Sequence, residues 1–219
     1  MRINEIFLSV QGETSSAGMP TAFVRTGGCN LRCTYCDTPY ALTTHGSVAM
    51  SVDEVMAAVA EKGGHCRRVC LTGGEPLIQP REEVQSLLDR LAAAGYEVSV
   101  ETSGSLPIEP FRLHDGQRWI LDMKVPSSGE SEAMSFDSLA LLRAVDEVKF
   151  VVGPRSDFDW SVELIRRYGL EGRARLLFSP IWGAVTPLQL TEWVLGSGID
   201  ARVQIQLHKI IWDPAARGV

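Results

Sequence analysis

The chain has 219 residues, of which 45% are hydrophobic, and this fits one compact domain spanning residues 1–219. Its formal net charge of -6, with no long run of basic residues, argues against nucleic acid and anionic membranes as partners. Residues 1–20 lack the apolar core of a signal peptide, and no stretch reaches the roughly 18 apolar residues of a membrane span, so we expect a cytoplasmic protein.

Short β-rich runs alternate with helical patterns along the chain. We predict strands at residues 21–26, 68–73, 97–102, 119–124, 147–153, 175–180 and 202–208. Ser51 and Glu54 form a capping box that begins a helix, and Pro80 begins a second helix that Gly95 ends. We expect further helices at 135–145, 156–169 and 186–198. Alternating strands and helices indicate parallel βα units, and a chain too short for a closed eight-unit barrel predicts a partial, open (β/α) barrel of about six parallel strands.

Glycine or chemically capable residues follow the apolar part of nearly every predicted strand. These segments read GGCN, TGGEP, ETSG, DMK, SPIWG and LHK. In a parallel barrel or sheet the carboxyl ends of the strands converge on one site. We therefore expect these separated segments to line one cavity.

A cysteine loop with C-x3-C-x2-C spacing follows the strand predicted at 21–26, and its thiols are Cys29, Cys33 and Cys36. In the cytoplasm thiols stay reduced, so such a cluster indicates metal or redox chemistry rather than disulfides. A [4Fe–4S] cluster normally takes four thiolates, and three of them leave one iron with an open coordination position. A zinc site completed by His45 or Cys66 is the alternative, although His45 has no partner at the usual zinc spacing.

With Tyr35 before its last cysteine, the loop resembles the signature of the radical S-adenosylmethionine (SAM) superfamily. TGGEP, residues 72–76, resembles the glycine-rich motif with which that superfamily holds the amino group of the methionine moiety. The resemblance implies that the amino and carboxylate groups of SAM chelate the open iron. It also implies that the reduced cluster splits the sulfonium and releases a 5′-deoxyadenosyl radical.

Further segments are similar to the 7-carboxy-7-deazaguanine synthase family, from about residue 5 to the C-terminus. They read EIFLSVQGET, FVRTGGCNLRCTYCDTPY, TGGEP, VETSGS and QLHKIIWDPAARGV. The family implies a carbon–nitrogen lyase that converts 6-carboxy-5,6,7,8-tetrahydropterin into 7-carboxy-7-deazaguanine with release of ammonia, in 7-deazapurine and queuosine biosynthesis. It implies regenerated SAM, Mg2+ on the substrate carboxylate, and flavodoxin or ferredoxin as electron donor. We also expect a homodimer.

Residue roles carry over where these motifs match. Cys29, Cys33 and Cys36 match the cluster ligands, and Thr38 matches the Mg2+ ligand. The positions that match the substrate pocket are Val10, Gln11, Gly12, Glu13, Arg25, Thr72, His208 and Val219. The positions that match SAM contacts are Tyr35, Cys36, Asp37, Gly73, Gly74, Glu75, Glu101, Asp122, Met123, Lys124, Ser179, Pro180, Ile181 and Trp182.

Several of these residues have simpler interpretations. From the residues alone, Arg25 fits a surface salt bridge, and Gln11 and Glu13 fit an ordinary turn, because charged residues near strand ends are usually solvated. A lone histidine is more often structural than catalytic, and His208 stands out because it ends the last predicted strand. The chain also departs from the family pattern: Thr14 replaces the second glycine of Q-G-E-G, Ser103 replaces the asparagine of E-T-N-G, and DMK stands where S-P-K is frequent.

Two other functions are weighed against this one. A glycyl-radical activating enzyme of the same superfamily shares the cysteine loop and acts on a protein partner, but the QGE turn, Arg25 and the terminal LHK argue against it. A non-catalytic iron- or zinc-binding module would not need TGGEP beside the cysteine loop.

Overall fold

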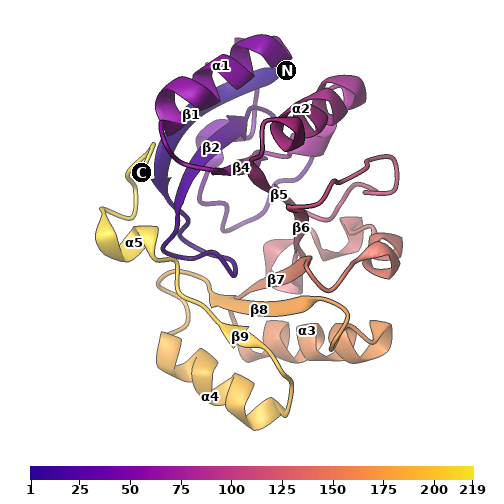
Figure 1. Cartoon of the computed structure of the whole chain (residues 1–219). Coiled ribbons are helices and arrows are strands. Elements are labelled where there is room, and N and C mark those ends of the chain that lie inside the picture. The colour runs from indigo at the N-terminus through magenta and orange to yellow at the C-terminus, as the bar shows by residue number, and fades with distance from the viewer.

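The computed structural model describes every residue, Met1–Val219, and contains a nine-stranded sheet in the order β3-β1-β2-β4-β5-β6-β7-β8-β9 (Figure 1). The strands are β1 (Arg2–Val10), β2 (Pro20–Thr26), β3 (Val48–Ala49), β4 (Arg68–Gly73), β5 (Glu97–Thr102), β6 (Gln117–Asp122), β7 (Glu147–Val152), β8 (Arg175–Pro180) and β9 (Arg202–Val203). The helices are α1 (Val52–Gly63), α2 (Arg81–Ala93), α3 (Arg155–Tyr168), α4 (Pro187–Ser197) and α5 (His208–Ile211). Short 3-10 turns cover Pro39–Ala41, Pro76–Ile78, Pro126–Ser128, Ser131–Ala133 and Phe136–Leu141.

The sheet forms an open, partial barrel, as the sequence predicts. Strands β2 and β4 to β9 run parallel, each to its neighbour, while β1 pairs antiparallel with β2 and β3 pairs antiparallel with β1. The two ends of the strand order, β3 and β9, do not pair, so the barrel does not close. Helices α1 to α4 lie on the outer side of the curved sheet (Figure 1). Because the parallel strands curve around a common axis, their carboxyl ends surround one opening.

Helices α1 and α4 begin where the sequence predicts, each at a residue that caps the helix. Ser51 accepts a hydrogen bond from the backbone N–H of Glu54, whose side chain returns to Ser51, so the capping box of α1 is complete. Thr186 and Gln189 form the same arrangement at the start of α4. No helix is long and apolar enough to span a bilayer.

Two predicted elements differ in the structure, and two strands of the structure, β1 and β3, were not predicted. Strand β1 lies outside the predicted set, and the helix expected at 135–145 is reduced to the 3-10 turn at Phe136–Leu141. Asp146 explains the second difference, because its carboxylate accepts the backbone N–H of Arg143 at 2.8 Å and also binds the Arg143 guanidinium, which holds the chain in a turn.

The strand predicted at 202–208 stops after β9, Arg202–Val203. From there the chain leaves β8 and packs against the turn between β1 and β2, where the backbone N–H of Leu207 donates to the carbonyl of Gly12 at 2.9 Å. His208 therefore begins helix α5 rather than ending a strand. The same contact joins the segment after β9 to the turn after β1, near the other edge of the open barrel.

Candidate active site

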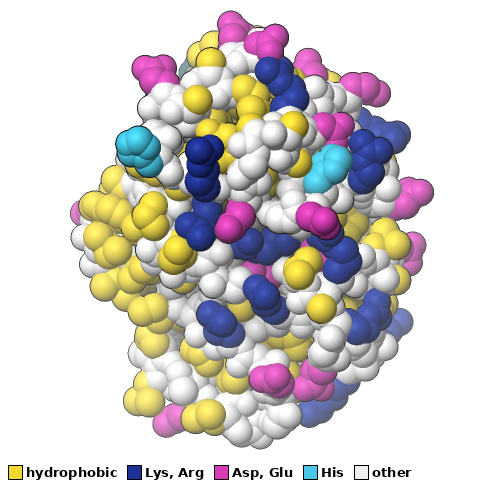
Figure 2. Space-filling model, in the orientation of Figure 1, with side chains coloured by type: hydrophobic (Ala, Val, Ile, Leu, Met, Phe, Trp, Pro, Cys, Tyr) yellow, Lys and Arg dark blue, Asp and Glu magenta, His cyan; other side chains and the backbone are white.

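A cavity of about 470 Å³ opens at the carboxyl ends of the parallel strands, within the roughly 300–1,000 Å³ of small-molecule sites. Figure 2 shows Lys and Arg side chains, with Asp and Glu beside them, gathered across the middle of this face. All the residues expected to hold cluster, cofactor or substrate line the cavity except Glu75, Met123, Ser179 and Pro180. The structure thus brings together segments from nearly the whole chain.

The cysteine loop is held by backbone hydrogen bonds on two sides. On one side the N–H of Cys29 donates to the carbonyl of Leu42 at 3.1 Å. On the other, the N–H of Thr34 donates to the carbonyl of Ser128 at 3.1 Å, and its hydroxyl donates to the carbonyl of Ser127 at 2.8 Å. The loop is therefore fixed by the protein scaffold itself.

The donor set fits a [4Fe–4S] cluster. Cys29, Cys33 and Cys36 all line the cavity, whereas Cys70 is fully buried in β4 and the Cys66 thiol donates to the carbonyl of Pro20, at the opposite end of β2. The three thiols do not converge as they would on a single metal ion, which a cluster does not require because each thiolate binds a different iron. Burial raises the pKa of Cys33 to about 11, so metal binding would release protons.

The zinc alternative finds no fourth ligand here. His45 is exposed and does not line the cavity, and Cys66 lies at the far end of β2. Three cysteines and an open side of the cavity are what an iron with a vacant coordination position would need.

Glycines bring the end of β4 against the cysteine loop. A Cβ atom on Gly74 would lie 2.1 Å from the carbonyl oxygen of Gly28, and one on Gly73 would lie 2.4 Å from the carbonyl oxygen of Thr26. Only glycine permits this close approach, and Gly73 also has a φ of 147°. The glycine pair therefore lines the cavity beside the start of the cysteine loop, where the sequence predicts a segment that holds SAM.

Glu75, the next residue, is expected to contact SAM but does not line the cavity. Its side chain is fully buried and points away from the cavity. It accepts hydrogen bonds from the N–H of Leu77 at 3.0 Å, from the hydroxyl of Thr102 at 2.8 Å, and from both the N–H and the hydroxyl of Ser103 at 2.7 Å. Glu75 thus fastens the glycine segment to the end of β5.

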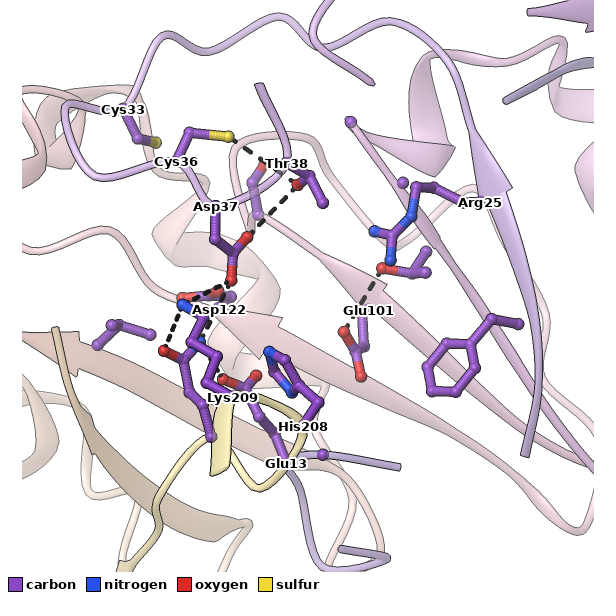
Figure 3. A pocket seen from close by; sticks show the side chains of 18 of the residues that line it. Glu13, Arg25, Cys33, Cys36, Asp37, Thr38, Glu101, Asp122, His208 and Lys209 are labelled. Carbon is purple, nitrogen blue, oxygen red and sulfur yellow. Dashed lines mark hydrogen bonds and ion pairs between the residues drawn. The ribbon is translucent and has the colours of Figure 1, made fainter. Parts of the chain in front are cut away.

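Charged side chains form a network on one wall of the cavity (Figure 3). Asp122 Oδ2 lies 3.0 Å from Lys124 Nζ and 3.2 Å from Lys149 Nζ, and Lys149 also pairs with Glu13. Burial alone would raise the pKa of Asp122, but the two ammonium groups lower it. Asp122 Oδ1 is buried without a hydrogen-bond partner, so it is free to accept a ligand hydroxyl such as that of a ribose.

Beside this network, toward Arg25, Glu101 accepts hydrogen bonds from Gln11 Nε2 at 3.0 Å and from the Thr72 hydroxyl at 3.4 Å (Figure 3). Arg25 Nε lies 2.7 Å from Glu5 Oε1, so the ion pair considered for Arg25 exists, but each side chain is only about one-fifth exposed and Arg25 lines the cavity. Burial raises the pKa of Glu101, although the Lys149 ammonium opposes that rise. This end of the cavity offers one guanidinium and one carboxylate to a polar, planar ligand.

Asp37 and Thr38 lie next to the last cysteine. The Thr38 hydroxyl is 4.0 Å from Cys36 Sγ and 3.5 Å from Asp37 Oδ1. Asp37 Oδ2 lies 3.4 Å from Lys209 Nζ. Burial alone would raise the pKa of Asp37, but Lys209 and Lys149 lower it, so this carboxylate remains ionised.

The turn between β1 and β2 enters the barrel from the amino ends of the parallel strands. Thr14 is fully buried with a φ of 68°, in the left-handed region, which accounts for glycine at the matching position of the common family pattern. The Gln204 side chain bonds both the N–H and the carbonyl of Thr14. His208 packs so closely on Gly12 that a Cβ there would lie 2.0 Å from its Nδ1, and burial lowers the pKa of His208.

The C-terminal segment passes over the same cavity. Its residues Pro214, Ala216, Gly218 and Val219 line the opening, and the guanidinium of Arg217 lies 3.9 Å from the centre of the Tyr40 ring. This cation–π contact holds the segment beside the cysteine loop.

Some residues expected to contact SAM do not line the cavity, and other residues that line it were not predicted. Met123 faces the core with no exposed surface, because Asp122 and Lys124 on either side face the cavity. Ser179 and Pro180 are buried in β8 away from the cavity wall. The missed polar residues that line the cavity include Tyr40, Ser103, Lys149, Gln206 and Lys209. Lys149 carried a usable signal, since a lysine inside the apolar run EVKFVV needs buried partners.

A family model described as the radical SAM superfamily matches residues 23–123. Together with the open barrel and the three-cysteine loop, this defines a radical SAM enzyme. Proteins named 7-carboxy-7-deazaguanine synthase are similar along their length: the one from Koribacter versatilis is 40% identical and covers 100% of both chains, and the one from Chlorobaculum tepidum is 42% identical over 100% of this chain and 97% of that one. The chain therefore belongs to the 7-carboxy-7-deazaguanine synthase family.

One solved structure agrees with this assignment, and a second shares only the fold. The crystal structure of QueE from Escherichia coli matches with a TM-score of 0.76 at 25% identity and covers 94% of each chain. A structure of TYW1 with a lysine-pyruvate adduct bound has a TM-score of 0.53 at 12% identity, covering 83% of this chain and 74% of that chain, and shares the fold alone.

Proposed function

We propose that this enzyme converts 6-carboxy-5,6,7,8-tetrahydropterin into 7-carboxy-7-deazaguanine with release of ammonia, for 7-deazapurine and queuosine biosynthesis. The observation that carries the proposal is a single cavity with three cysteines at one side and the pair of Arg25 and Glu101 at the other. When bound, the cluster and SAM supply one-electron chemistry that removes and returns a substrate hydrogen atom. The names of the full-length relatives support a small-molecule synthase and do not favour a glycyl-radical activating enzyme.

Different residues of the chain are proposed to bind the pterin and SAM. Arg25 offers a planar guanidinium to the substrate carboxylate, and Glu13 accepts hydrogen bonds from ring N–H and amino donors of the pterin. The resemblance matches Glu101 to SAM, but Glu101 accepts hydrogen bonds from Gln11 and Thr72 of the substrate pocket, so we assign it to the pterin as well. Asp122 and Lys124 offer opposite charges to the hydroxyl and carboxylate groups of SAM. The C-terminal segment ending at Val219 lines the opening and would limit the access of water.

Magnesium is the proposal's third cofactor, with Thr38 as its ligand from the chain. One hydroxyl suits Mg2+ only if substrate oxygens and waters complete the octahedron, and the Asp37 carboxylate 3.5 Å away adds favourable charge. Thr38→Ala should therefore reduce the stimulation of turnover by added MgCl2 while the iron content stays unchanged. Equal magnesium stimulation in the variant would remove Thr38 from the metal's coordination shell.

Flavodoxin or ferredoxin is the proposed electron donor, and the cytoplasm is the proposed compartment because thiolate ligands need reducing surroundings. A homodimer is also proposed. Figure 2 shows apolar side chains gathered at the left, over α5, where Ile210 is 56% and Ile211 is 51% exposed. Sedimentation of the wild type and of Ile211→Asp would test the dimer, because a charge at a contact between copies should shift the chain to monomer.

The reaction is tested with protein reconstituted with iron and sulfide under anaerobic conditions. We expect 7-carboxy-7-deazaguanine and ammonia in equal amounts from 6-carboxytetrahydropterin, with SAM regenerated. Arg25→Met is the informative variant, because it should lose substrate affinity and keep its cluster. A reconstituted wild type that cleaves SAM but leaves the pterin unchanged would contradict the proposal.

A further inference from the structure

A buried lysine outside all the motifs connects two parts of the cavity. Lys149 lies in β7 between Val148 and Phe150, and only 6% of its surface is exposed. The chain has four lysines, and three of them, Lys124, Lys149 and Lys209, line this one cavity. Lys149 differs from the other two because it bridges two carboxylates from distant segments.

The first carboxylate is fixed beside Lys149 by the sheet. The parallel register of β6 and β7 pairs Asp122 with Lys149, so both side chains point to the same face. Lys149 Nζ lies 3.2 Å from Asp122 Oδ2, and Lys124 Nζ lies 3.0 Å from the same oxygen. With Oδ2 occupied by two ammonium groups, Oδ1 remains the free acceptor in the cavity.

The second carboxylate comes from the turn between β1 and β2. Lys149 Nζ pairs with Glu13 Oε2, and Gln206 Nε2 donates to Glu13 Oε1 at 2.8 Å. Both oxygens of Glu13 are therefore bound, and its carboxylate has one orientation. Without the lysine, Glu13 would be a buried charge held by a single amide.

We propose that Lys149 is a positioning residue that couples the two binding regions by orienting Glu13 on the substrate side and Asp122 on the SAM side. This inference rests on the proposed function, in which Glu13 faces the pterin and Asp122 faces SAM. Lys149 remains protonated because the surrounding carboxylates hold its pKa above the ordinary value against the effect of burial, so it acts as a fixed cation and not as a proton acceptor. Binding a ligand in one region then changes how firmly the carboxylate of the other region is oriented, and hence the affinity of that region for its own ligand.

Lys149→Met keeps the length of the side chain and removes its charge. We expect the dissociation constant of labelled SAM, measured by equilibrium dialysis, and the KM for the pterin each to rise about tenfold, as is typical for losing a charge-assisted hydrogen bond. Lys124 contacts Asp122 but not Glu13, so Lys124→Met should raise only the dissociation constant of SAM. Lys62→Met, on the outer helix α1, is the control and should change neither.

A double-mutant cycle separates positioning from general damage. In a Glu13→Gln background, adding Lys149→Met should change the KM less than twofold, because its partner is already gone, while the SAM constant still rises. Additive effects on the KM, or a folded Lys149→Met protein with both wild-type constants, would overturn the inference.

If Lys149→Met does not fold, Glu13→Gln and Asp122→Asn decide the question with the lysine in place. Their effects on the KM should be non-additive, and simple additivity would refute the coupling. A wild type that makes no product but binds both ligands would contradict the proposed function instead, so the two failures can be told apart.

Discussion

Replacing Glu75 by alanine should destabilise the protein before any ligand is bound. The fully buried carboxylate accepts four hydrogen bonds, two of them from the backbone N–H groups of Leu77 and Ser103. The hydroxyls of Thr102 and Ser103 can rotate toward other acceptors, but the two N–H groups would remain buried without partners. At roughly 1–3 kcal/mol for each such group, Glu75→Ala should lower the free energy of unfolding by about 4 kcal/mol.

Urea unfolding of the metal-free protein measures this loss directly. For a chain of this length, about 4 kcal/mol corresponds to a fall in Tm of roughly 8–16 °C. Glu75→Gln keeps one acceptor oxygen and should lose about half as much, whereas Glu61→Ala, exposed on α1, should stay within about 0.5 kcal/mol of the wild type. If Glu75→Ala unfolds with the wild-type free energy but binds SAM weakly, Glu75 contacts the cofactor and the reasoning is wrong.

Three further outcomes are expected. Cys33→Ala should lose its iron and its visible absorption after reconstitution, because two thiolates cannot hold the cluster, while Cys66→Ser keeps both; full iron content in the first variant would exclude the loop as the cluster site. Arg25→Lys should raise the KM for the pterin about tenfold, since an ammonium lacks the planar fork, and an unchanged KM would place the substrate carboxylate elsewhere. Burial lowers the pKa of His208 in the folded protein, so the unfolded chain binds more protons as the pH falls below about 6.5, and stability is lost over that range. The loss between pH 7.5 and 5.5 should be smaller in His208→Gln, measured by urea unfolding at each pH, and equal losses would show that other groups cause it.

Much of the fold could be predicted because its signals are local. The capping boxes at Ser51 and Thr186 depend on residues three positions apart, and the apolar runs of β4 to β8 lie where the alternation of strands and helices places them. Strand β1 and the end of the chain were harder, because both depend on contacts between distant segments. Gln204, directly after β9, accepts a hydrogen bond from the backbone N–H of Thr14, 190 residues earlier, and no local pattern encodes that contact.

The candidate site divides in the same way. The cysteine loop and the glycine pair are contiguous motifs, so their place in the cavity followed from the sequence. The orientation of single side chains did not: Glu75 and Met123 lie within or beside recognised motifs but face the interior, because the alternation of a strand and the turn after it set their direction. Lys149 belongs to no motif, and Gln206 carries no predicted role within QLHKIIWDPAARGV; their contacts become visible only when distant segments are placed side by side.

The hydrogen bonds that fix the cysteine loop on both sides have a consequence for the life of the enzyme. Since the loop is tied to the carbonyls of Leu42, Ser127 and Ser128 without help from iron, losing the metal to oxygen need not unravel the surrounding chain. The apoprotein keeps its three cysteines in place, so the cluster can be rebuilt from iron and sulfide without new synthesis of the polypeptide.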